Sequence, residues 1–489
     1  MSHRSLRYPV AVRFFLFLVA VGAAFGQSLI IRNVTVVDAN GARPKSTVYV
    51  SGGRIVGSAA RGAKTIEGKG KFLIPALWDM HVHLWDREHM AGLYVAAGVL
   101  GVRDMGSDLK RTRPLQADIK AGRAAGPLIY TSGAPVDGPG SGITQSPVII
   151  ATTPEDGRRA TDVTDEALAD FVKVLSRMPY DAYIAMAQRA RVRRIPFAGH
   201  LPEAVPVSEA LDARQKSMEH LFGIALGCTP LETTLREQRA QAIANKDYAA
   251  LREVRERTYA TFSAGIANEL FRRMARLSVW QTPTLTLRKR LSFMDLDRLA
   301  ESEDIKYVPE TVRSGWTDPR EEAKKATPEQ MADFREDYEF HSKLVGHMRN
   351  AGVGLLAGTD TGDAYVVPGF SLHDELALLV EAGLSPAEAL ASTTVQPARY
   401  FNIEATHGTV ERGKIANLVL LDADPMADIR NTRRISAVIH QGRVLDRKCL
   451  DTLLTGKPAP CAFVSSPPTP APSSVKRPAS SRKRGSRTR

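Results

Sequence analysis

The sequence predicts an α/β fold, in which a (β/α)8 barrel of the TIM type is joined to a small β-sandwich domain built from both chain ends. Eight apolar, strand-like runs recur along the chain, and helix-like sequence follows seven of them before the next run begins. Short β-branched runs separated by tight turns occupy 29–58, and similar runs return at 418–441. We predict barrel strands at 72–77, 101–105, 128–132, 171–174, 196–199, 217–219, 281–287 and 353–357.

The composition is that of a large globular protein. The 489 residues are 43% apolar and 24% charged, which is enough to bury an extensive core. The formal charge of +13 lies mostly at the two chain ends, and the body between them is nearly balanced. We therefore expect no nucleic-acid partner. The oligomeric state cannot be read from this pattern, and a homo-oligomer stays open.

The predicted organisation has four parts. They are a signal peptide at 1–26, a composite β-sandwich at 27–78 and 402–447, a barrel at 79–401, and a disordered tail rich in Pro, Ser and basic residues at 448–489. The barrel span exceeds the usual length of about 250 residues, so it requires insertions. The charged, Ala/Glu/Arg-rich segments 230–278 and 290–348 are the candidates, and as helices over the barrel mouth they could shape a substrate lid.

The N-terminus has the pattern of a cleaved secretory signal. Arg4, Arg7 and Arg13 precede an apolar run at 14–25, and small residues follow before Gln27. A span across a bilayer needs about 20 apolar residues, and this run is shorter. We therefore predict a secreted or periplasmic protein with no stable membrane insertion after cleavage.

The chain has three cysteines, which cannot build a disulfide framework and show no metal-type spacing. Cys449 and Cys461 flank a short Gly/Pro-containing segment, and an oxidising compartment would permit a bond between them. Whether they pair is left open by the sequence.

Histidines follow several predicted strands at the end where barrel active sites lie. His81 and His83 come directly after the first strand, and alternate residues on a strand point the same way. His200 and His220 follow the fifth and sixth strands. A lone histidine in such a place is more often a hydrogen-bonded structural residue. Four of the eleven histidines at the ends of three strands favour a metal site instead.

Two further residues complete the candidate site. Asp360 follows the eighth predicted strand, where a carboxylate can bind metal and move protons, although a turn-capping role is the alternative. Lys173 falls on the fourth strand, where a free ammonium inside a barrel would be costly. A neutral lysine amine can add carbon dioxide and offer carbamate oxygens to bridge two ions. A surface lysine is the alternative interpretation.

The order His-x-His, Lys, His, His, Asp on strands one, four, five, six and eight resembles the amidohydrolase superfamily. Within it, the sequence is most similar to imidazolonepropionase-like hydrolases and Xaa-Pro dipeptidase-like enzymes, over most of 29–446. The segments that carry the resemblance are LIPALWDMHVH at 73–83, GVRDMG at 101–106, SLHDEL at 371–376 and GTVERGKIANLV at 408–419.

The resemblance implies two Zn²⁺ ions per chain, although other divalent ions are compatible with the same ligands. His81, His83 and Asp360 would hold one ion, His200 and His220 the other, and carboxylated Lys173 would bridge them. A hydroxide between the ions would attack the carbonyl, and Asp360 would act as general base and then general acid. The implied activity is cleavage of the C–N (amide) bond of a small-molecule substrate such as a dipeptide or N-acyl amino acid.

The sequence also departs from the family pattern. The loop after the third strand, 137–142, lacks the histidine found in many relatives, and the two long insertions exceed a minimal barrel. Both changes fall where substrate is held, so the substrate itself stays open. Arg288 and Arg290 could reach a substrate carboxylate, although arginine clusters at surfaces are common.

Other functions remain as alternatives. A mononuclear deaminase or cyclic-amide hydrolase would use the histidines and Asp360 without needing Lys173. A lactonase or phosphotriesterase-type hydrolase would direct the same hydroxide at another electrophile. A degenerate barrel that serves as a binding protein would be expected to lose metal ligands, yet all six are present.

Overall fold

The computed structural model describes residues 28–84, 87–143, 146–295, 302–457, 459 and 461. The predicted signal peptide lies outside these residues, as does the predicted tail beyond Cys461. Among the helices in the described ranges, none combines the length and the apolar character that crossing a bilayer requires.

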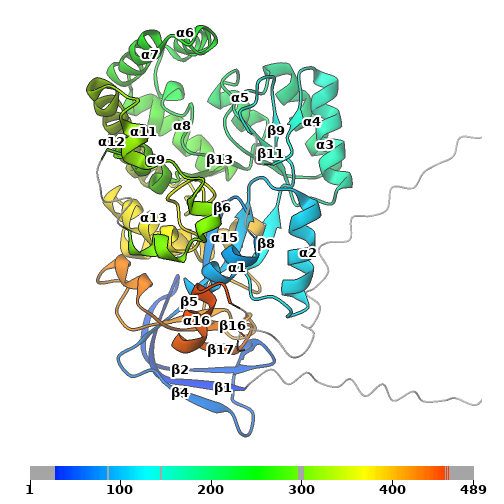
Figure 1. Ribbon diagram of the computed structural model, residues 1–489, viewed down its shortest axis with the longest axis vertical. Helices are drawn as coiled ribbons and strands as arrows, with labels where there is room; N and C mark the ends of the chain where they lie inside the picture. Colours follow the sequence, from blue (N-terminus) through cyan, green and yellow to red (C-terminus); the bar gives the residue numbers. More distant parts are fainter. Residues whose placement is uncertain are drawn as a thin grey trace, which may run out of the picture.

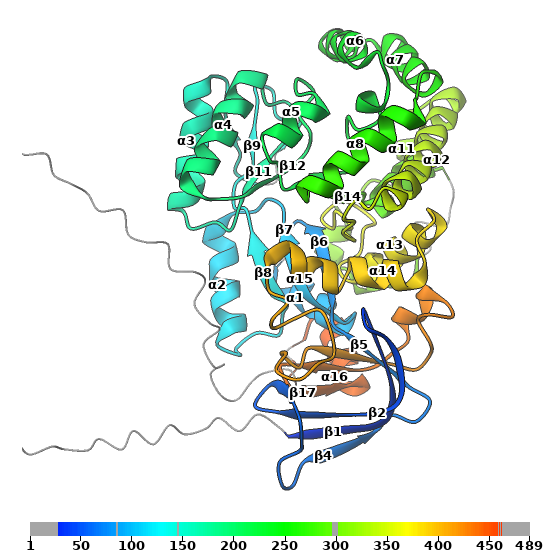
Figure 2. The same cartoon turned by 180° about the vertical axis from the view of Figure 1, so that it is seen from behind.

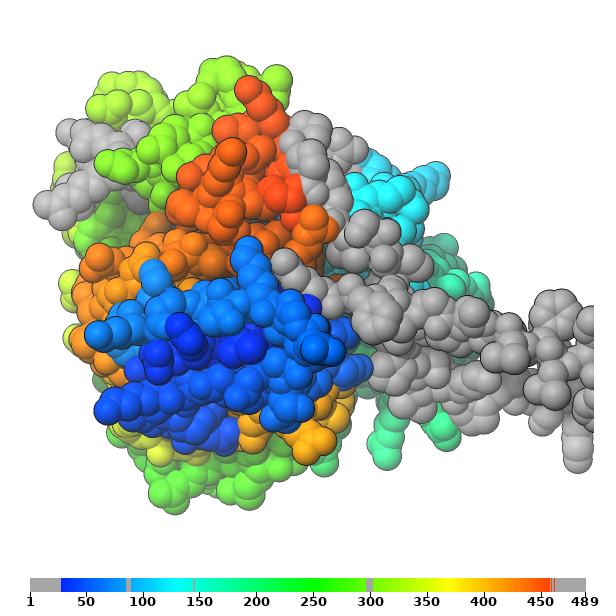
Figure 3. All heavy atoms as spheres, turned by 90° about the horizontal axis from the view of Figure 1, so that it is seen from below, coloured from blue at the N-terminus to red at the C-terminus, as the bar shows by residue number. Residues whose placement is uncertain are grey.

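Both chain ends contribute to one large sheet. Its strands are β1 (Leu29–Asp38), β2 (Gly41–Ser51), β3 (Arg54–Val56), β4 (Lys64–Glu67), β5 (Phe72–Pro75), β15 (Leu418–Leu421), β16 (Ile435–His440) and β17 (Arg443–Asp446). The order is β17-β16-β15-β5-β1-β2-β3, with β4 paired to β1. N-terminal and C-terminal segments accordingly lie side by side at one end of the molecule (Figures 1 and 3). The predicted β-sandwich is not confirmed, because these strands belong to a single sheet.

The remaining strands are parallel and form two further sheets. One contains β6 (Leu77–Val82), β7 (Val99–Asp104) and β8 (Leu128–Thr131). The other runs β10 (Ile149–Ile150), β9 (Val136–Asp137), β11 (Val172–Val174), β12 (Phe197–Gly199), β13 (Ser217–Glu219) and β14 (Trp280–Thr282). The fold is thus mixed α/β, as predicted.

The predicted barrel does not close into one continuous sheet. Segment 353–361 lies between β14 and β6 and forms backbone hydrogen bonds with both, but its strand pairing with them is limited to isolated bridges, from Leu355 to Gln281 and from Thr361 to Val82. The predicted eighth strand at 353–357 is therefore absent as a regular strand. One physical reason is Gly354, whose missing side chain leaves room for the indole of Trp280 and weakens strand pairing.

Helices surround the parallel strands. Those beside the strands are α1 (Arg87–Ala96), α2 (Leu109–Lys120), α3 (Pro154–Glu166), α4 (Tyr180–Arg193), α5 (Val207–Asp212), α13 (Phe370–Glu381), α14 (Pro386–Ser392) and α15 (Val395–Phe401). The two long segments expected to be insertions contain α6 (Glu232–Asn245), α7 (Tyr248–Ala260), α8 (Ala264–Leu277), α10 (Glu310–Arg313), α11 (Pro319–Ala323) and most of α12 (Pro328–Asn350). Of these, α6 and α7 project at the end opposite the large sheet (Figures 1 and 2). Helix α9 (Leu285–Ser292) begins between these two segments.

Two predicted strands differ from the observed ones. The run 72–77 is divided at Ala76, with β5 in the large sheet and β6 in the parallel sheet. The run 281–287 is a strand only as far as Thr282, because α9 begins at Leu285. Thr284 adopts a left-handed conformation, φ 50°, which ends the extended backbone there.

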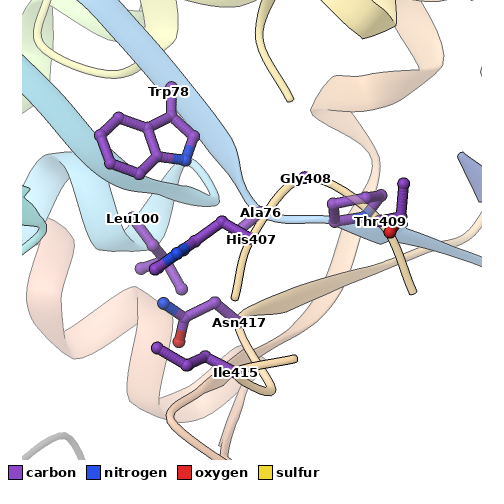
Figure 4. A pocket seen from close by; sticks show the side chains of 9 residues that line it. Ala76, Trp78, Leu100, His407, Gly408, Thr409, Ile415 and Asn417 are labelled. Atoms are coloured by element: carbon purple, nitrogen blue, oxygen red, sulfur yellow. The ribbon is translucent and has the colours of Figure 1, made fainter. Parts of the chain in front are cut away.

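The crossing at Ala76 is tightly packed. A cavity of about 10 Å³ lies beside it, and its lining includes Trp78, Leu100, His407 and Asn417 (Figure 4). That volume accommodates about one water molecule. The cavity is therefore too small to receive a substrate.

The described C-terminal residues include a helix, so the tail predicted from 448 begins within regular structure. Helix α16 (Arg447–Leu454) buries Cys449, Leu450 and Leu453 and packs against α1. The structure joins Cys449 and Cys461 in a disulfide, with the two Cα atoms 6.0 Å apart.

Replacing Cys449 with serine should destabilise the protein. The bond closes a loop with a sequence separation of 12 residues, which restricts the unfolded chain. Its loss should lower the free energy of unfolding by about 3 kcal/mol, as measured by denaturant titration. Wild-type protein assayed with reductant is the matched control and should lose a similar amount. Equal stability of the oxidised and reduced wild type would contradict this expectation.

Candidate metal centre

Strand β6 places the two histidines of the His-x-His motif. His81 lies within the strand and is fully buried. His83 is the first residue after the strand, and its side chain is 22% exposed. The Nε2 atoms of both approach one carboxylate oxygen, Oδ1 of Asp360, at 3.2 Å for His81 and 3.1 Å for His83. The two rings therefore converge as the alternation of side chains along a strand predicts.

Asp360 reaches these histidines from segment 353–361. Its backbone N–H donates to the carbonyl of His81 at 2.8 Å, and its left-handed φ of 62° turns the chain at this point. The donor atoms of His81, His83 and Asp360 all lie within 4.8 Å of one another, as three ligands of a single ion must.

His200 and His220 form the other side of the site. Their ring centroids are 4.9 Å apart, and the ring of His220 is 4.6 Å from that of His81. Ser176 Oγ lies 2.7 Å from Nδ1 of His200, and Thr284 Oγ1 lies 2.7 Å from Nδ1 of His220. Since Nδ1 is engaged in both rings, Nε2 is the nitrogen that can reach a metal ion.

The ionisation states of this cluster suit metal ligation. Burial holds the pKa values of His200 and His220 well below the usual histidine value, so both rings are neutral. Burial alone would raise the pKa of Asp360, but the neighbouring His81 and His220 outweigh it and hold that pKa well below its usual value. Neutral imidazoles and an ionised carboxylate are the forms that bind metals.

Lys173, on β11, is a lysine buried inside the protein at the candidate site. Its side chain is 1% exposed, and its Nζ has no hydrogen-bond partner among the described residues. Burial lowers its pKa to about 8, against the attraction of Glu219 and Asp360. A buried ammonium without a partner is costly, so the site favours the neutral amine.

A divalent metal pair fits these observations. The Nε2 of His81 makes no well-aligned hydrogen bond within the part of the chain that the structure describes, although Asp360 Oδ1 lies 3.2 Å away. The unsatisfied His81 and Lys173 atoms belong to one cluster, because Lys173 interacts electrostatically with His200, His220 and Asp360. Imidazole nitrogens and a carboxylate oxygen are ligands that zinc accepts.

Two buried charged residues position His81 through its Nδ1 atom. Glu219, on β13, lies with Oε2 2.9 Å from Nδ1 of His81, and Arg103, on β7, donates through Nη2 to both Glu219 oxygens at 2.8 and 2.9 Å. Both side chains are fully buried, and Arg103 also donates to Ser217 and Tyr400. This network fixes which nitrogen of His81 faces the site.

Sequence patterns alone did not predict the roles of Glu219 and Arg103. Arg103 lies within the family-like segment GVRDMG, and Glu219 ends the predicted strand 217–219. Asp79 was likewise unassigned, although it is fully buried and accepts hydrogen bonds from the N–H and hydroxyl groups of Thr359. Burial raises the pKa of Asp79 to about 7. A charged residue within an apolar strand run was the signal that could have identified all three.

Replacing Glu219 with glutamine should weaken metal binding. The neutral amide cannot hold the Nδ1 proton of His81 as a carboxylate does, and it leaves the Arg103 charge unbalanced. We expect zinc affinity to fall about 10- to 100-fold, measured by competition with a chelator, and saturating zinc to restore much of the lost activity. Glu388→Gln, on the surface of α14, is the control. Unchanged zinc affinity in Glu219→Gln would show that the contact does not position His81.

The two arginines proposed as carboxylate ligands have different environments. Arg288 donates through Nε to the carbonyl of His220 at 2.7 Å and through Nη1 to Asp337 at 2.9 Å. These contacts hold Arg288 against the backbone of His220, so it supports the site. Arg290 is 8% exposed, and its Nε has no hydrogen-bond partner among the described residues.

Comparisons with known proteins identify similar sequences and folds. Residues 95–445 match the sequence model of the amidohydrolase family. The solved structure of a bottromycin amidohydrolase superimposes with a TM-score of 0.69 at 21% identity, covering 87% of this chain and 88% of that one. A Xaa-Pro dipeptidase with bound methionine gives a TM-score of 0.62 at 18% identity, covering 86% of this chain and 100% of that one.

One curated relative matches locally. N-acetylglucosamine-6-phosphate deacetylase from Lysinibacillus sphaericus is 46% identical over 63 residues. The match covers 12% of this chain and 16% of the relative, so the chain spans less than a fifth of that relative's length in the comparison.

Proposed function

Because the chain belongs to the amidohydrolase family, we propose that it is a metal-dependent hydrolase that cleaves the C–N (amide) bond of a small substrate. A dipeptide or an N-acyl amino acid is the proposed substrate class. The observation that carries the proposal is the convergence of His81, His83 and Asp360 beside a buried lysine amine with no partner.

The six residues divide into two ligand sets. His81, His83 and Asp360 would hold one zinc ion, and His200 and His220 would hold the second. Lys173, carboxylated on Nζ, would bridge them, which would convert an unpaired buried ammonium into an anionic oxygen ligand. When bound, two zinc ions lower the pKa of water into the neutral range and polarise a carbonyl oxygen.

The chain's own proton carrier would be Asp360. Its Oδ1 lies against His81 and His83, and its Oδ2 is 3.7 Å from Nε2 of His220. The carboxylate would take a proton from the attacking water as the new C–O bond forms. It would then deliver that proton to the amine nitrogen as the C–N bond breaks. The low pKa of Asp360 keeps the carboxylate ionised at neutral pH.

The architecture proposed for this enzyme is the (β/α)8 barrel at 79–401, flanked by the domain at 27–78 and 402–447. Two contacts support a ring of strands. The N–H of Asp170 donates to the carbonyl of Thr131 at 2.9 Å between β8 and β11, and the N–H of Met80 donates to Ala357 at 2.9 Å. We also propose export through the N-terminal signal, which agrees with the disulfide between Cys449 and Cys461.

Elemental analysis of protein purified without chelators tests the proposal directly. We expect about two zinc ions per chain, together with amine release from members of a dipeptide and N-acyl amino acid library. One ion per chain with release of ammonia would favour the mononuclear deaminase. Two ions with turnover only of lactones or phosphotriesters would replace the amide substrate. No metal and no turnover would favour a binding protein.

A further inference from the structure

Phe222 is an aromatic side chain that remains exposed beside the candidate metal ligands. It follows His220 by two residues, and its ring is 4.9 Å from the ring of His220 and 5.3 Å from that of His200. Despite these contacts, 38% of the residue stays exposed. An exposed aromatic ring next to a catalytic centre is a typical contact for a ligand.

Residues of helices α7, α9 and α12 orient this ring. The Arg288 guanidinium lies 5.5 Å from the ring centroid of Phe222, and its Nε and Nη2 both donate to the His220 carbonyl. Asp337, on α12, accepts from Nη1 of Arg288 and from the hydroxyl of Tyr259 on α7. Helices α7, α9 and α12 thus contribute one connected set of contacts that orients the ring.

Packing against the protein accounts for only part of the Phe222 ring surface, so the exposed remainder can contact a ligand. One part of its surface is covered by the two histidines and the guanidinium. The rest of the residue stays exposed, within ring-contact distance of His200 and His220, the two candidate ligands. An amide activated at these ligands would therefore lie near the ring, and a group beside that amide is the candidate contact.

We propose that Phe222 is a specificity-determining residue that packs against an apolar, preferably aromatic, group next to the scissile amide. The substrate class is then narrower than small amides in general, because it carries an apolar group on the acyl or the amine side. The identity of the cleaved bond comes from the proposed function, on which the inference rests. The identity of the recognised group comes from the contacts and exposure of the Phe222 ring.

Equilibrium binding to the zinc-loaded, full-length protein tests this inference. The probes are N-acetylphenylalanine, N-benzoylglycine and N-acetylglycine, which place an aromatic ring on the amine side, on the acyl side or on neither. We expect wild type to bind at least one aromatic probe about tenfold more tightly than N-acetylglycine. Phe222→Ala should remove that preference, Phe222→Leu should keep part of it, and zinc content should stay unchanged in both. If a probe is hydrolysed, its KM replaces the dissociation constant.

Phe334→Ala is the matched control, because Phe334 lies on α12 with a similar exposure of 41%. It should keep the aromatic preference. No preference in wild type, or equal weakening of all three probes in Phe222→Ala, would overturn the inference. Loss of zinc in Phe222→Ala would also overturn it, since the ring would then only support the histidines. Turnover is scored separately: aromatic preference without amide cleavage would refute the proposed reaction and leave the role of Phe222 standing.

Discussion

Replacing Lys173 with alanine should abolish most activity and remove one of two metal ions. The bridge would be lost, and the stabilisation of transition-state charge that depends on the second ion would be lost with it. We expect kcat/KM to fall about 10³-fold or more, and zinc to fall from about two ions to about one per chain. Compared in their metal-free forms, the variant and wild type should have similar thermal stability, because the substitution removes a buried amine with no partner among the described residues.

Two further measurements make this result specific to a carbamate bridge. Added acetate or propionate should restore part of the activity of Lys173→Ala, because a short carboxylate can occupy the vacated space. Lys173→Arg keeps the positive charge but cannot form the carbamate, so it should be as inactive as the alanine variant. Two zinc ions and full activity in Lys173→Ala would refute the bridge and favour the mononuclear alternative.

Asp360→Asn should separate metal binding from proton transfer. The amide oxygen can still lie against His81 and His83, but it cannot accept a proton at neutral pH. We expect kcat to fall about 10²- to 10⁴-fold, with KM and zinc content much less affected. The pH dependence of any residual activity should lose the limb that reports ionisation of this carboxyl group.

The neighbouring Asp363→Asn is the control for Asp360→Asn. It removes a carboxylate from the same loop, and burial raises the pKa of that carboxyl above its usual value. Its effect on kcat should stay below about tenfold, because Asp363 has no role in the proposed proton transfer. Equal losses in the two variants would show that the loop charge matters rather than a specific proton carrier.

Local sequence patterns predicted most of the parallel strands, because each strand is a short apolar run with a clear boundary. The observed bounds of β13 coincide with the prediction at 217–219, and β12 differs from it by one residue. The prediction of a strand over 281–287 was wrong beyond Thr282, since alternating Thr and Leu favour a strand but α9 begins at Leu285. Glu375, distant in sequence, accepts from the backbone N–H groups of Leu285 and Thr286 and so caps α9.

The support of the site was harder to predict than the ligands themselves. Each candidate ligand lies on or directly after a predicted strand and has a recognisable residue type. The hydrogen-bond partners of Arg103 and Arg288 come from other elements, so their roles can be seen only in the folded chain. Arg103 positions His81 through Glu219, and Arg288 holds the backbone of His220. The sequence therefore indicated that Arg288 could be a substrate ligand, whereas the structure makes it a support.

The division of one apolar run at Ala76 has an energetic consequence. Its N–H donates to Asn417, and a single residue separates β5 of the large sheet from β6, which carries His81. Unfolding of the large sheet would release one end of the strand that holds the metal ligands. By thermodynamic linkage, an ion bound by His81 also stabilises the sheet formed by the two chain termini, because the ion binds only the folded state. Zinc loading should thus protect the backbone amides of β5 and β15 from hydrogen exchange, although neither strand carries a candidate ligand.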